Sequence, residues 1–253
     1  MIKNWIVTGD LHGQIDDRFI KVSKYYEPSE TVIIILGDTG ANYYLNKKDK
    51  KFKEQLCSLG FTFYCVKGNH EARPDEVNGM QGTYDPDVEG FVYFEPEFPY
   101  IKYFQEFGTY YINDYKTLVI GGAYSVDKEY RILRGWQWFP TEQLNEDEMA
   151  ECMKMIEEEG REYDLVLSHT CPYSWMPIDL FLPFIDQSKV DNRTEYFLEE
   201  VKEKIQFKKW CYGHYHADRS QNPQARMFFA DAVDIHMLIE KSILKTDWSE
   251  KIC

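Results

Sequence analysis

The sequence is an acidic chain of 253 residues with a formal net charge of −14 and 43% hydrophobic residues. Nucleic-acid binding through phosphates needs a basic groove. The net charge of the chain is strongly negative, so no extended nucleic-acid partner is expected. No apolar run approaches the roughly 18 residues of a membrane span, and residues 1–10 lack the pattern of a signal peptide. We therefore expect a soluble protein with no membrane partner.

The cysteine pattern argues for reduced thiols. None of the six cysteines forms a CxxC pair; they are Cys57, Cys65, Cys152, Cys171, Cys211 and Cys253. Cys65 and Cys211 lie within apolar runs, and Cys171 closely follows one, which predicts buried thiols. A cytoplasmic location is consistent with this usage.

The N-terminal part of the chain alternates between strand and helix patterns. Short apolar runs at residues 4–8, 31–36 and 61–66 predict buried strands, and each leads into a glycine followed by Asp or Asn. Helix-like stretches near residues 15–26 and 47–58 separate these runs. Such alternation predicts βαβ units and a parallel sheet.

The remainder of the chain adds further strands and helices. An acidic helix is expected from Thr141, a plausible N-cap, to about residue 159. A second helix is expected to about residue 204, opened by a capping box of Asn192 and Glu195. The remaining strand patterns lie at residues 91–124, 163–167, 209–212, 225–230 and 234–239. We interpret residues 1–253 as one mixed α/β domain.

Residues 172–191 differ from the rest, because they are apolar but aperiodic and contain Pro172, Pro177 and Pro183. Long segments of this kind either form a rim or lid over a substrate pocket or pack as ordinary surface loops. The sequence leaves both alternatives open.

The position of the histidines carries the functional signal. Five of the six directly follow a predicted strand: His12, His70, His169, His214 and His216. Asp10, Asp38 and Asn69 also lie just beyond strand ends. Because ligands of open α/β sheets gather at the carboxyl ends of strands, these side chains are expected to converge. His236 lies inside the last predicted strand and is interpreted as a structural histidine.

The chemistry of this set is that of a metal centre. Asp, Asn and His offer oxygen and nitrogen ligands that suit Mn, Fe or Zn, and the absence of cysteine argues against a structural zinc site. Seven such ligands suit two ions if one carboxylate bridges them, and two ions can clamp a phosphoryl group. Taken singly, each motif is also explained as a turn or helix cap; only the complete ordered set favours a metal site.

Five ordered motifs resemble those of calcineurin-like metallophosphoesterases. They are Gly9-Asp10-Leu11-His12-Gly13, Gly37-Asp38, Gly68-Asn69-His70-Glu71, Ser168-His169 and Gly213-His214-Tyr215-His216. The resemblance spans residues 9–216. It implies a four-layer αββα sandwich, in which helices flank two mixed β-sheets, with a dinuclear site at the carboxyl ends of the strands. It also implies hydrolysis of a phosphate ester by a hydroxide that bridges two divalent transition-metal ions, with Mn expected and Fe or Zn as alternatives.

The resemblance also implies a role for each motif residue. The first metal would be held by Asp10, His12 and His216. The second would be held by Asn69, His169 and His214. Asp38 would bridge the two ions, and His70 would protonate the leaving oxygen without touching a metal.

Two features refine the resemblance. The segment from Gly68 to Arg73 is similar to the phosphoprotein phosphatase branch, which includes protein phosphatases and diadenosine tetraphosphatases. That branch carries Asp-Arg-Gly after its second motif, where this chain has Ala41-Asn42-Tyr43. The usual carboxylate partner of the catalytic histidine and one phosphate-binding arginine are therefore missing.

The sequence offers substitutes for both missing groups. Glu71 is the candidate to orient His70. Arg73, Arg131 and Arg134 are candidates to bind phosphate, because a guanidinium group matches phosphate oxygens in bidentate fashion. The last two follow residues 121–127, which resemble small bacterial and phage members of the superfamily.

The favoured function is hydrolysis of a phosphomonoester, with a phosphorylated small molecule or a phosphoprotein as substrate. A phosphodiesterase or a dinucleotide polyphosphate hydrolase is the enzymatic alternative. A metal-binding interaction scaffold is the alternative without activity. Scaffold members of the superfamily often lose a metal ligand or the catalytic histidine, whereas this chain keeps the full set.

Overall fold

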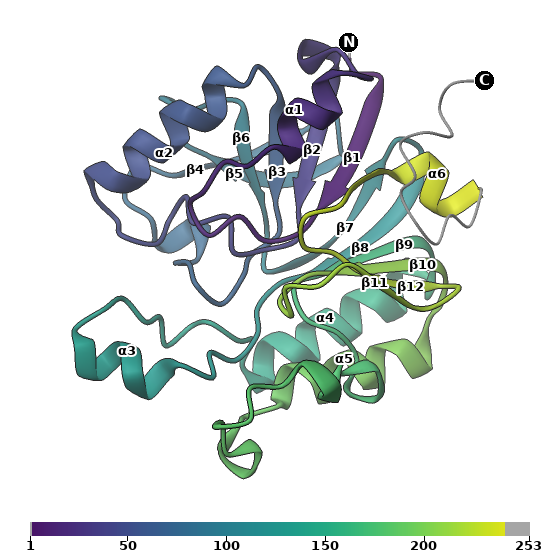
Figure 1. Ribbon diagram of the computed structural model, residues 1–253. Coiled ribbons are helices and arrows are strands. Elements are labelled where there is room, and N and C mark those ends of the chain that lie inside the picture. The colour runs from purple at the N-terminus through teal and green to yellow at the C-terminus, as the bar shows by residue number, and fades with distance from the viewer. Residues whose placement is uncertain (1, 241–253) are drawn as a thin grey trace.

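The computed structural model, which describes residues 2–240, contains two mixed β-sheets that lie face to face (Figure 1). The first sheet consists of β1 (Asn4–Thr8), β2 (Thr31–Ile35), β3 (Thr62–Cys65), β4 (Gln81–Asp85), β5 (Gly90–Phe94), β6 (Ile101–Phe104) and β13 (Ala232–Asp234). The second consists of β7 (Phe107–Ile112), β8 (Tyr115–Ile120), β9 (Glu162–Ser168), β10 (Gln206–Tyr212), β11 (Arg219–Asn222) and β12 (Ala225–Met227). Their strand orders are β13-β1-β2-β3-β6-β5-β4 and β11-β12-β10-β9-β8-β7.

The described residues form six α-helices, four of which cover the outer faces of the sheets. The α-helices are α1 (Arg18–Ser23), α2 (Lys47–Ser58), α3 (Lys128–Arg134), α4 (Glu146–Glu159), α5 (Arg193–Lys204) and α6 (Ile235–Glu240). Short 3-10 turns occur at η1 (Pro28–Glu30), η2 (Pro74–Glu76), η3 (Tyr173–Trp175), η4 (Ile178–Leu180) and η5 (Gln187–Lys189). Phe19 of α1 and Phe52 of α2 pack on the first sheet, and Cys152 of α4 and Phe197 of α5 pack on the second. The expected four-layer αββα sandwich is confirmed.

Strand β1 illustrates why the sequence shows apolar runs rather than alternation. Trp5 and Val7 point into the core between the two sheets, whereas Ile6 points to the helical layer outside. Successive side chains of a strand point to opposite faces, and here both faces are buried. The parallel pairing of β1 with β2 and of β2 with β3 matches the expected βαβ arrangement.

The acidic helix α4 begins later than the sequence indicated. Its N-cap is Asn145, whose side chain accepts a hydrogen bond from the backbone N–H of Glu148, while the Glu148 side chain accepts one from the backbone N–H of Asn145. This reciprocal capping box outcompetes the expected N-cap Thr141, whose hydroxyl donates to Glu76 instead.

The expected capping box of helix α5 does not form. Asn192 occupies the N-cap position, but its side chain makes no capping hydrogen bond. Glu195 is buried instead and accepts a hydrogen bond from the hydroxyl of Thr170 at 2.8 Å. A tertiary contact with the loop after β9 therefore overrides the local capping motif.

The last predicted strand, residues 234–239, is wrong. The chain pairs with β1 only through β13, and helix α6 begins at Ile235. A short apolar run does not by itself distinguish a strand from a buried helical turn. His236 lies on this helix, with its Nδ1 2.9 Å from the hydroxyl of Tyr115, and takes no part in the site described below.

The described cysteines are free thiols, and Cys65, Cys171 and Cys211 are buried as expected; Cys253 lies outside the described residues. Among the described helices, none has the length and apolar character needed to cross a bilayer.

Candidate functional site

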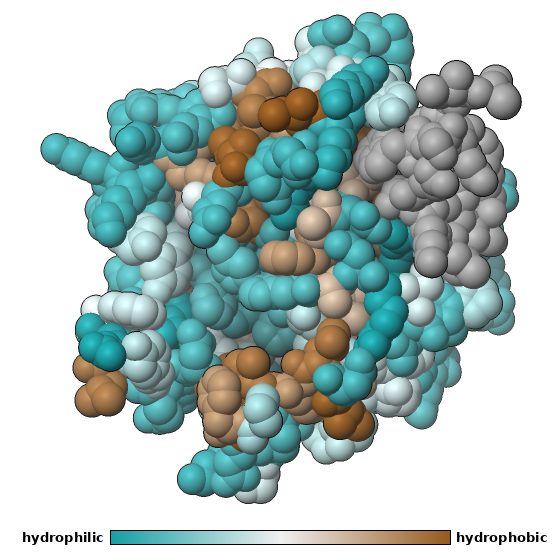
Figure 2. Space-filling view, in the orientation of Figure 1, coloured by the Kyte–Doolittle hydropathy of each residue, from teal (hydrophilic) through white to brown (hydrophobic). Residues whose placement is uncertain are grey.

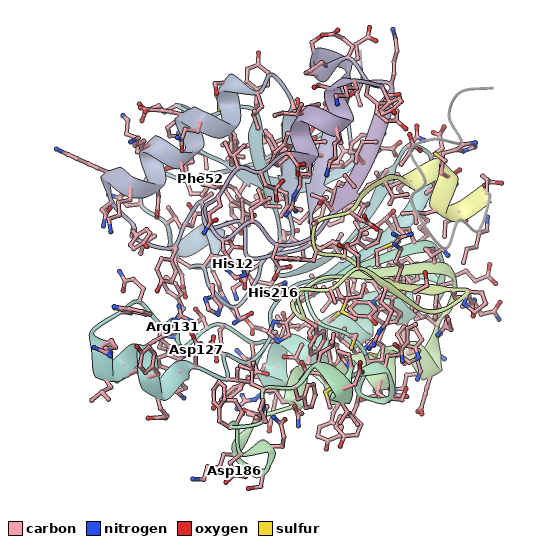
Figure 3. All side chains as sticks on the ribbon, viewed as in Figure 1. His12, Phe52, Asp127, Arg131, Asp186 and His216 are labelled. Atoms are coloured by element: carbon pink, nitrogen blue, oxygen red, sulfur yellow. The ribbon has the colours of Figure 1, made fainter. Side chains whose placement is uncertain are left out.

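The loops that follow five parallel strands bring the motif residues together. Asp10, Asp38 and Asn69 follow β1, β2 and β3 in the first sheet, whereas His169 follows β9 and His214 follows β10 in the second. Figure 3 shows His12 and His216, from the two sheets, side by side near the centre of the molecule. The carboxyl ends of strands from both sheets therefore contribute to one site.

A first group of potential ligands consists of Asp10, His12 and His216, whose ligand atoms lie within 4.8 Å of one another. Nε2 of His12 and Nε2 of His216 are only 2.8 Å apart. Oδ2 of Asp10 lies 3.6 Å from the first nitrogen and 3.3 Å from the second, and this buried oxygen has no hydrogen-bond partner. Two imidazole nitrogens and a buried carboxylate oxygen therefore converge on one point, as the ligands of a cation do.

A second group surrounds His169, which is fully buried. Its Nδ1 is 2.7 Å from the backbone carbonyl of Leu36, so this nitrogen carries the proton and Nε2 faces the site. Nε2 lies 2.8 Å from Oδ1 of Asn69 and 3.6 Å from Oδ2 of Asp38. The amide nitrogen of Asn69 donates to the hydroxyl of Ser125, which turns the amide oxygen toward His169.

Asp38 links the groups. Its Oδ1 accepts the backbone N–H of His70 at 2.7 Å, and its backbone carbonyl accepts the N–H groups of Leu11 and His12. Asp38 also belongs to two further sets of closely spaced ligand atoms, one with His12 and His70 and one with Asp10 and His169. This position suits a bridging carboxylate.

His214 and His70 lie at the edge of these groups. His214 is half-buried, its ring centroid lies 5.0 Å from that of His169, and its backbone N–H donates to Oδ1 of Asp10. It is not a member of the three closest ligand sets among the described residues. His70 lies within reach of His12 and Asp38, so proximity alone does not separate a ligand from an outer acid; its role rests on the motif.

The backbone of the site is held in an unusual conformation. His12, Asp38, His214 and His216 have positive φ angles of 48°, 46°, 69° and 51°. This left-handed region costs free energy for residues with a Cβ atom, and such residues cluster at functional sites. Surrounding contacts therefore maintain a ligand geometry that the local sequence disfavours.

Glycine is required where the backbone approaches a ligand. A Cβ atom on Gly68 would lie 2.0 Å from Oδ1 of Asp38, and one on Gly213 would lie 2.4 Å from Oδ1 of Asp10. Both distances are far below van der Waals contact. Any larger residue would displace a carboxylate of the site.

Electrostatic effects favour charged carboxylates. Burial raises the pKa of the Asp38 carboxyl, but the neighbouring His169 and His70 imidazoles hold it well below its usual range. Burial lowers the pKa of His169, but Asp38 outweighs this effect and raises it to about 9. Burial and the charge of His169 lower the pKa of His214 to about 3. A proton on His169 thus supplies positive charge that a cation would replace.

The residues present fit divalent metal ions. Potential ligand atoms from separate strands lie within hydrogen-bond distance of one another, and Oδ2 of Asp10 is buried with no hydrogen-bond partner. The set contains oxygen and nitrogen donors and no sulfur, which suits ions of intermediate hardness such as Mn, Fe or Zn.

Comparison with known proteins agrees with this geometry. A family model described as calcineurin-like phosphoesterase matches residues 4–218. The chain belongs to the calcineurin-like phosphoesterase family. Members of this family are metal-dependent phosphoester hydrolases, so the fold, the donor set and the family model lead to the same class of chemistry.

Three solved structures align with this phosphoesterase over most of its length. One crystal structure aligns with a TM-score of 0.52 at 12% identity, covering 94% of this chain and 96% of the other. A structure of the Thermus thermophilus protein TT1561 aligns with a TM-score of 0.49 at 11% identity, covering 97% and 98%. Phosphopantetheinyl hydrolase (PptH) from Mycobacterium tuberculosis aligns with a TM-score of 0.43 at 15% identity, covering 89% and 88%. The first of these alignments shows a shared fold. A search of curated proteins finds no match.

Arg73 does not reach the site of this phosphoesterase. Its guanidinium pairs with Glu148 and Glu106 and donates to the backbone carbonyls of Thr141 and Gln143. All of its donors are thereby engaged in tying the loop after β3 to the start of α4. This arrangement corrects the expectation of a phosphate contact and makes Arg73 a structural residue.

The other two arginines differ from each other. Arg134 is exposed and lies over the ring of Tyr130, away from the pocket. Arg131 is buried, and one terminal nitrogen donates to the Ser125 hydroxyl at 3.2 Å. Its Nε and second terminal nitrogen have no hydrogen-bond partner. Together with burial, the charge of Arg131 lowers the pKa of His70. The structure therefore places Arg131, and not Arg134, behind the candidate catalytic histidine.

Glu71 does not orient His70. Its carboxylate is buried and accepts the backbone N–H of Gly68 at 2.9 Å, so it shapes the turn that carries Asn69. Burial raises the pKa of Glu71 to about 7. The carboxylate that approaches Nε2 of His70 is Asp127, at 3.8 Å. Asp127 lies in the 121–127 segment, whose signal in the sequence is its resemblance to small bacterial and phage members of the superfamily.

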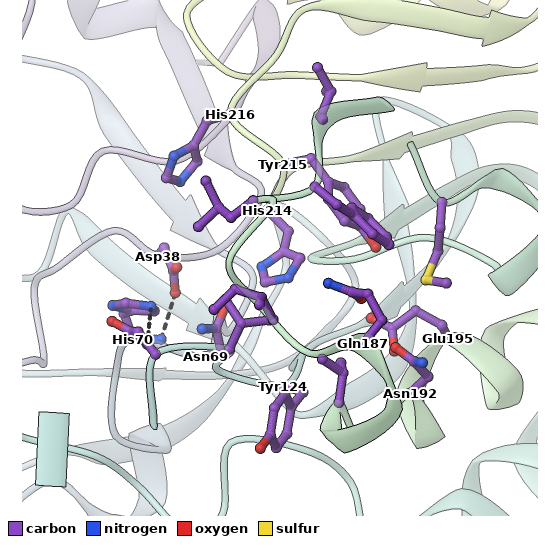
Figure 4. Close-up of a pocket in the computed structure, with 18 of the residues that line it drawn as sticks. Asp38, Asn69, His70, Tyr124, Gln187, Asn192, Glu195, His214, Tyr215 and His216 are labelled. Atoms are coloured by element: carbon purple, nitrogen blue, oxygen red, sulfur yellow. Dashed lines mark hydrogen bonds and ion pairs between the residues drawn. The ribbon is translucent and has the colours of Figure 1, made fainter. Parts of the chain in front are cut away.

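A pocket of about 420 Å³ opens beside the ligand groups (Figure 4). One end contains Asp38, Asn69, His70 and His214. Much of the wall comes from the 172–191 segment and consists of Met176, Leu180, Phe181, Leu182, Ile185, Gln187 and Val190. Figure 2 shows hydrophobic side chains gathered on the lower part of this face, where Figure 1 places the chain between β9 and α5.

Proposed function

We propose that this protein is a phosphomonoesterase that uses two divalent metal ions. The observation that carries the proposal is the convergence of potential ligand atoms from both sheets around Asp38, next to His70 and a pocket. Family membership supports phosphoester hydrolysis in general. The number of ions and the preference for monoesters are our inference from the ligand set and the pocket.

In this proposal Asp10, His12 and His216 hold one ion and Asn69, His169 and His214 hold the other. Asp38 lies between the groups and is shared. When bound, the ions neutralise the charge of the phosphoryl oxygens and supply the nucleophile. The protein positions the ester so that its leaving oxygen faces His70.

His70 then donates a proton to the departing oxygen. The backbone N–H of His70 donates to Asp38, so the loop that carries this acid is fixed relative to the ligand groups. Asp127 takes the place of the carboxylate that the sequence lacks at residues 41–43, because its Oδ1 lies 3.8 Å from Nε2 of His70 and accepts no hydrogen bond; the same oxygen lies 3.8 Å from a terminal nitrogen of Arg131. A hydrogen bond of catalytic length forms only after a small movement, as is common for sites without substrate.

Metal removal tests the proposal directly. We expect the purified protein to bind two transition-metal equivalents, to lose activity on chelation and to regain it with Mn²⁺, because the buried carboxylates need compensating charge. Elemental analysis and turnover of a phosphate monoester provide the measurements. Stoichiometric metal without hydrolysis of any ester would favour the interaction scaffold, and chelator-resistant hydrolysis would contradict the metal mechanism.

The role of residues 172–191 can be tested with two phenylalanines. Phe181 lines the pocket and stacks near Tyr215, whereas Phe184 is 77% exposed and does not line it. Burying an aromatic ring contributes about 1.5–3 kcal/mol, so we expect Phe181→Ala to lower kcat/KM for an apolar ester by about 10-fold. Phe184→Ala is the matched control and should have little effect. Equal effects of the two variants, or a loss of thermal stability alone, would support an ordinary surface loop.

A further inference from the structure

The pocket has a second polar end, opposite the metal ligands. In Figure 4, Glu195 and Asn192 lie on the far side of the pocket from Asp38 and His70, with Gln187 between the two ends. Glu195 is only 3% exposed. The pocket therefore joins a site for phosphate to a separate group of hydrogen-bonding side chains.

Glu195 has unused hydrogen-bonding capacity. One carboxylate oxygen accepts the hydroxyl of Thr170 at 2.8 Å, but Oε2 is buried and has no partner among the described residues. A buried carboxylate that lacks partners is costly, and burial raises the pKa of Glu195 to about 7. The local sequence predicts that Glu195 caps α5, but no such cap forms. A contact with a distant segment of the chain therefore places this carboxylate at the pocket.

The pocket between the two ends selects against a second anionic group. Its wall is formed mainly by apolar side chains, including Val126, Met176, Leu180, Ile185 and Val190. Among the residues that line it, all of them within the described part of the chain, there is no Lys or Arg. A carboxylate or second phosphate at the far end would meet Glu195 without any compensating cation.

We propose that the substrate is a small organic phosphate monoester whose leaving group is apolar along its length and ends in a hydrogen-bond donor that binds Glu195. This inference rests on the proposed phosphomonoesterase function and specifies its substrate class. The donor is a hydroxyl, an amide N–H or an amine, since each pairs with a carboxylate oxygen. A volume of about 420 Å³ suits a small molecule rather than a folded phosphoprotein.

Alkyl phosphates test the proposal because they change only the far end of the leaving group. The series is hexyl phosphate and its omega-hydroxy, omega-amino and omega-carboxy derivatives, with butyl and octyl analogues to vary length. For the Mn²⁺-loaded wild type we expect kcat/KM to be about 10-fold higher with a hydroxy or amino end than with a plain end. The carboxy compound should be about 10-fold poorer than the plain compound. This comparison does not depend on any variant folding.

Variants assign the preference to Glu195. We expect Glu195→Gln to reduce the preference for the amino end and to improve turnover of the carboxy compound, because the charge is lost while the shape is kept. Glu200→Gln removes the same charge from an exposed position of the same helix and should leave the ranking unchanged. A ranking that shifts equally in both variants would overturn the assignment.

Binding without catalysis separates this inference from the proposed function. The corresponding alcohols, hexanol with a plain, amino or carboxy end, can be titrated into metal-free protein by calorimetry. Tighter binding of the amino alcohol in wild type, lost in Glu195→Gln, supports the recognition site even if hydrolysis fails. If all four phosphates are hydrolysed equally well and the alcohols bind alike, the inference is wrong while the phosphomonoesterase stands. If no monoester is hydrolysed by metal-loaded protein, the proposed function itself fails.

Discussion

Replacing Asp38 with Asn is expected to abolish turnover of every phosphate ester and to release metal. Asp38 is the carboxylate shared by the closely spaced ligand sets, so losing its charge weakens both ion sites. Because a bound ion contributes several kcal/mol to the stability of the transition state, we expect a loss of about 10³-fold or more. The defect should be the same for alkyl and aryl leaving groups. Both need the metal ions to supply the nucleophile before the leaving group departs.

The fold of the Asp38 variant should remain intact. An Asn oxygen can still accept the backbone N–H of His70, and the backbone carbonyl still holds Leu11 and His12. In the metal-free protein the neighbouring His169 and His70 imidazoles hold the pKa of the Asp38 carboxyl well below its usual range, so the charged carboxylate stabilises the fold and the variant should be less stable than wild type without metal at neutral pH. It should also gain little thermal stability when Mn²⁺ is added.

Asp85 offers a matched control for this result. It is also buried, but it lies far from the metal ligands in the chain and pairs with Tyr64 and Lys102. Asp85→Asn should lower thermal stability while metal content remains that of wild type. Full metal content and activity in Asp38→Asn would contradict the proposed bridge.

The second large effect is expected at His70. A positioned proton donor contributes about 10²–10⁴-fold when the leaving group is a poor one. His70→Asn should therefore reduce hydrolysis of an alkyl phosphate by about this factor, with both metals still bound. Nitrophenolate needs the proton less, so the defect should shrink for nitrophenyl phosphate.

Asp127 should affect turnover only through the proton that His70 donates to the leaving group. Asp127→Asn should cause a smaller defect that follows the same dependence on the leaving group, and it should add little once His70 is replaced. Glu71→Gln is the informative comparison, because its carboxylate binds Gly68 and not His70. It should alter stability or metal binding rather than leaving-group dependence. Loss of metal in His70→Asn, or an equal defect on both esters, would show that His70 is a ligand.

The chemistry of the site could be recognised from the sequence because it depends on local order. Each motif residue directly follows a run of apolar residues that forms a buried strand, and parallel strands end at one edge of a sheet. Asp10, Asp38 and Asn69 are therefore brought together by any fold that keeps β1, β2 and β3 parallel and adjacent. The residue types then restrict the chemistry to oxygen and nitrogen coordination.

The partners of charged side chains were decided by the tertiary structure. Arg73 has a motif position that suggests phosphate binding, but Glu148 lies 75 residues away and takes its guanidinium. Glu71 is adjacent to His70 in the sequence, yet the turn geometry directs it inward to Gly68, and the distant Asp127 approaches the ring instead. Long-range pairing of this kind leaves no local pattern.

The same reasoning applies to secondary structure and to the pocket. Residues 234–239 have the apolar character of a strand, but only β13 pairs with β1, and the chain continues as helix α6 from Ile235. Asn192 and Glu195 contain a complete local capping motif, yet Thr170 captures the carboxylate and directs it to the pocket. The sequence by itself thus determined which atoms could perform the chemistry. The tertiary structure decided which of them meet, because contacts between distant segments outweigh the small free energies of local motifs.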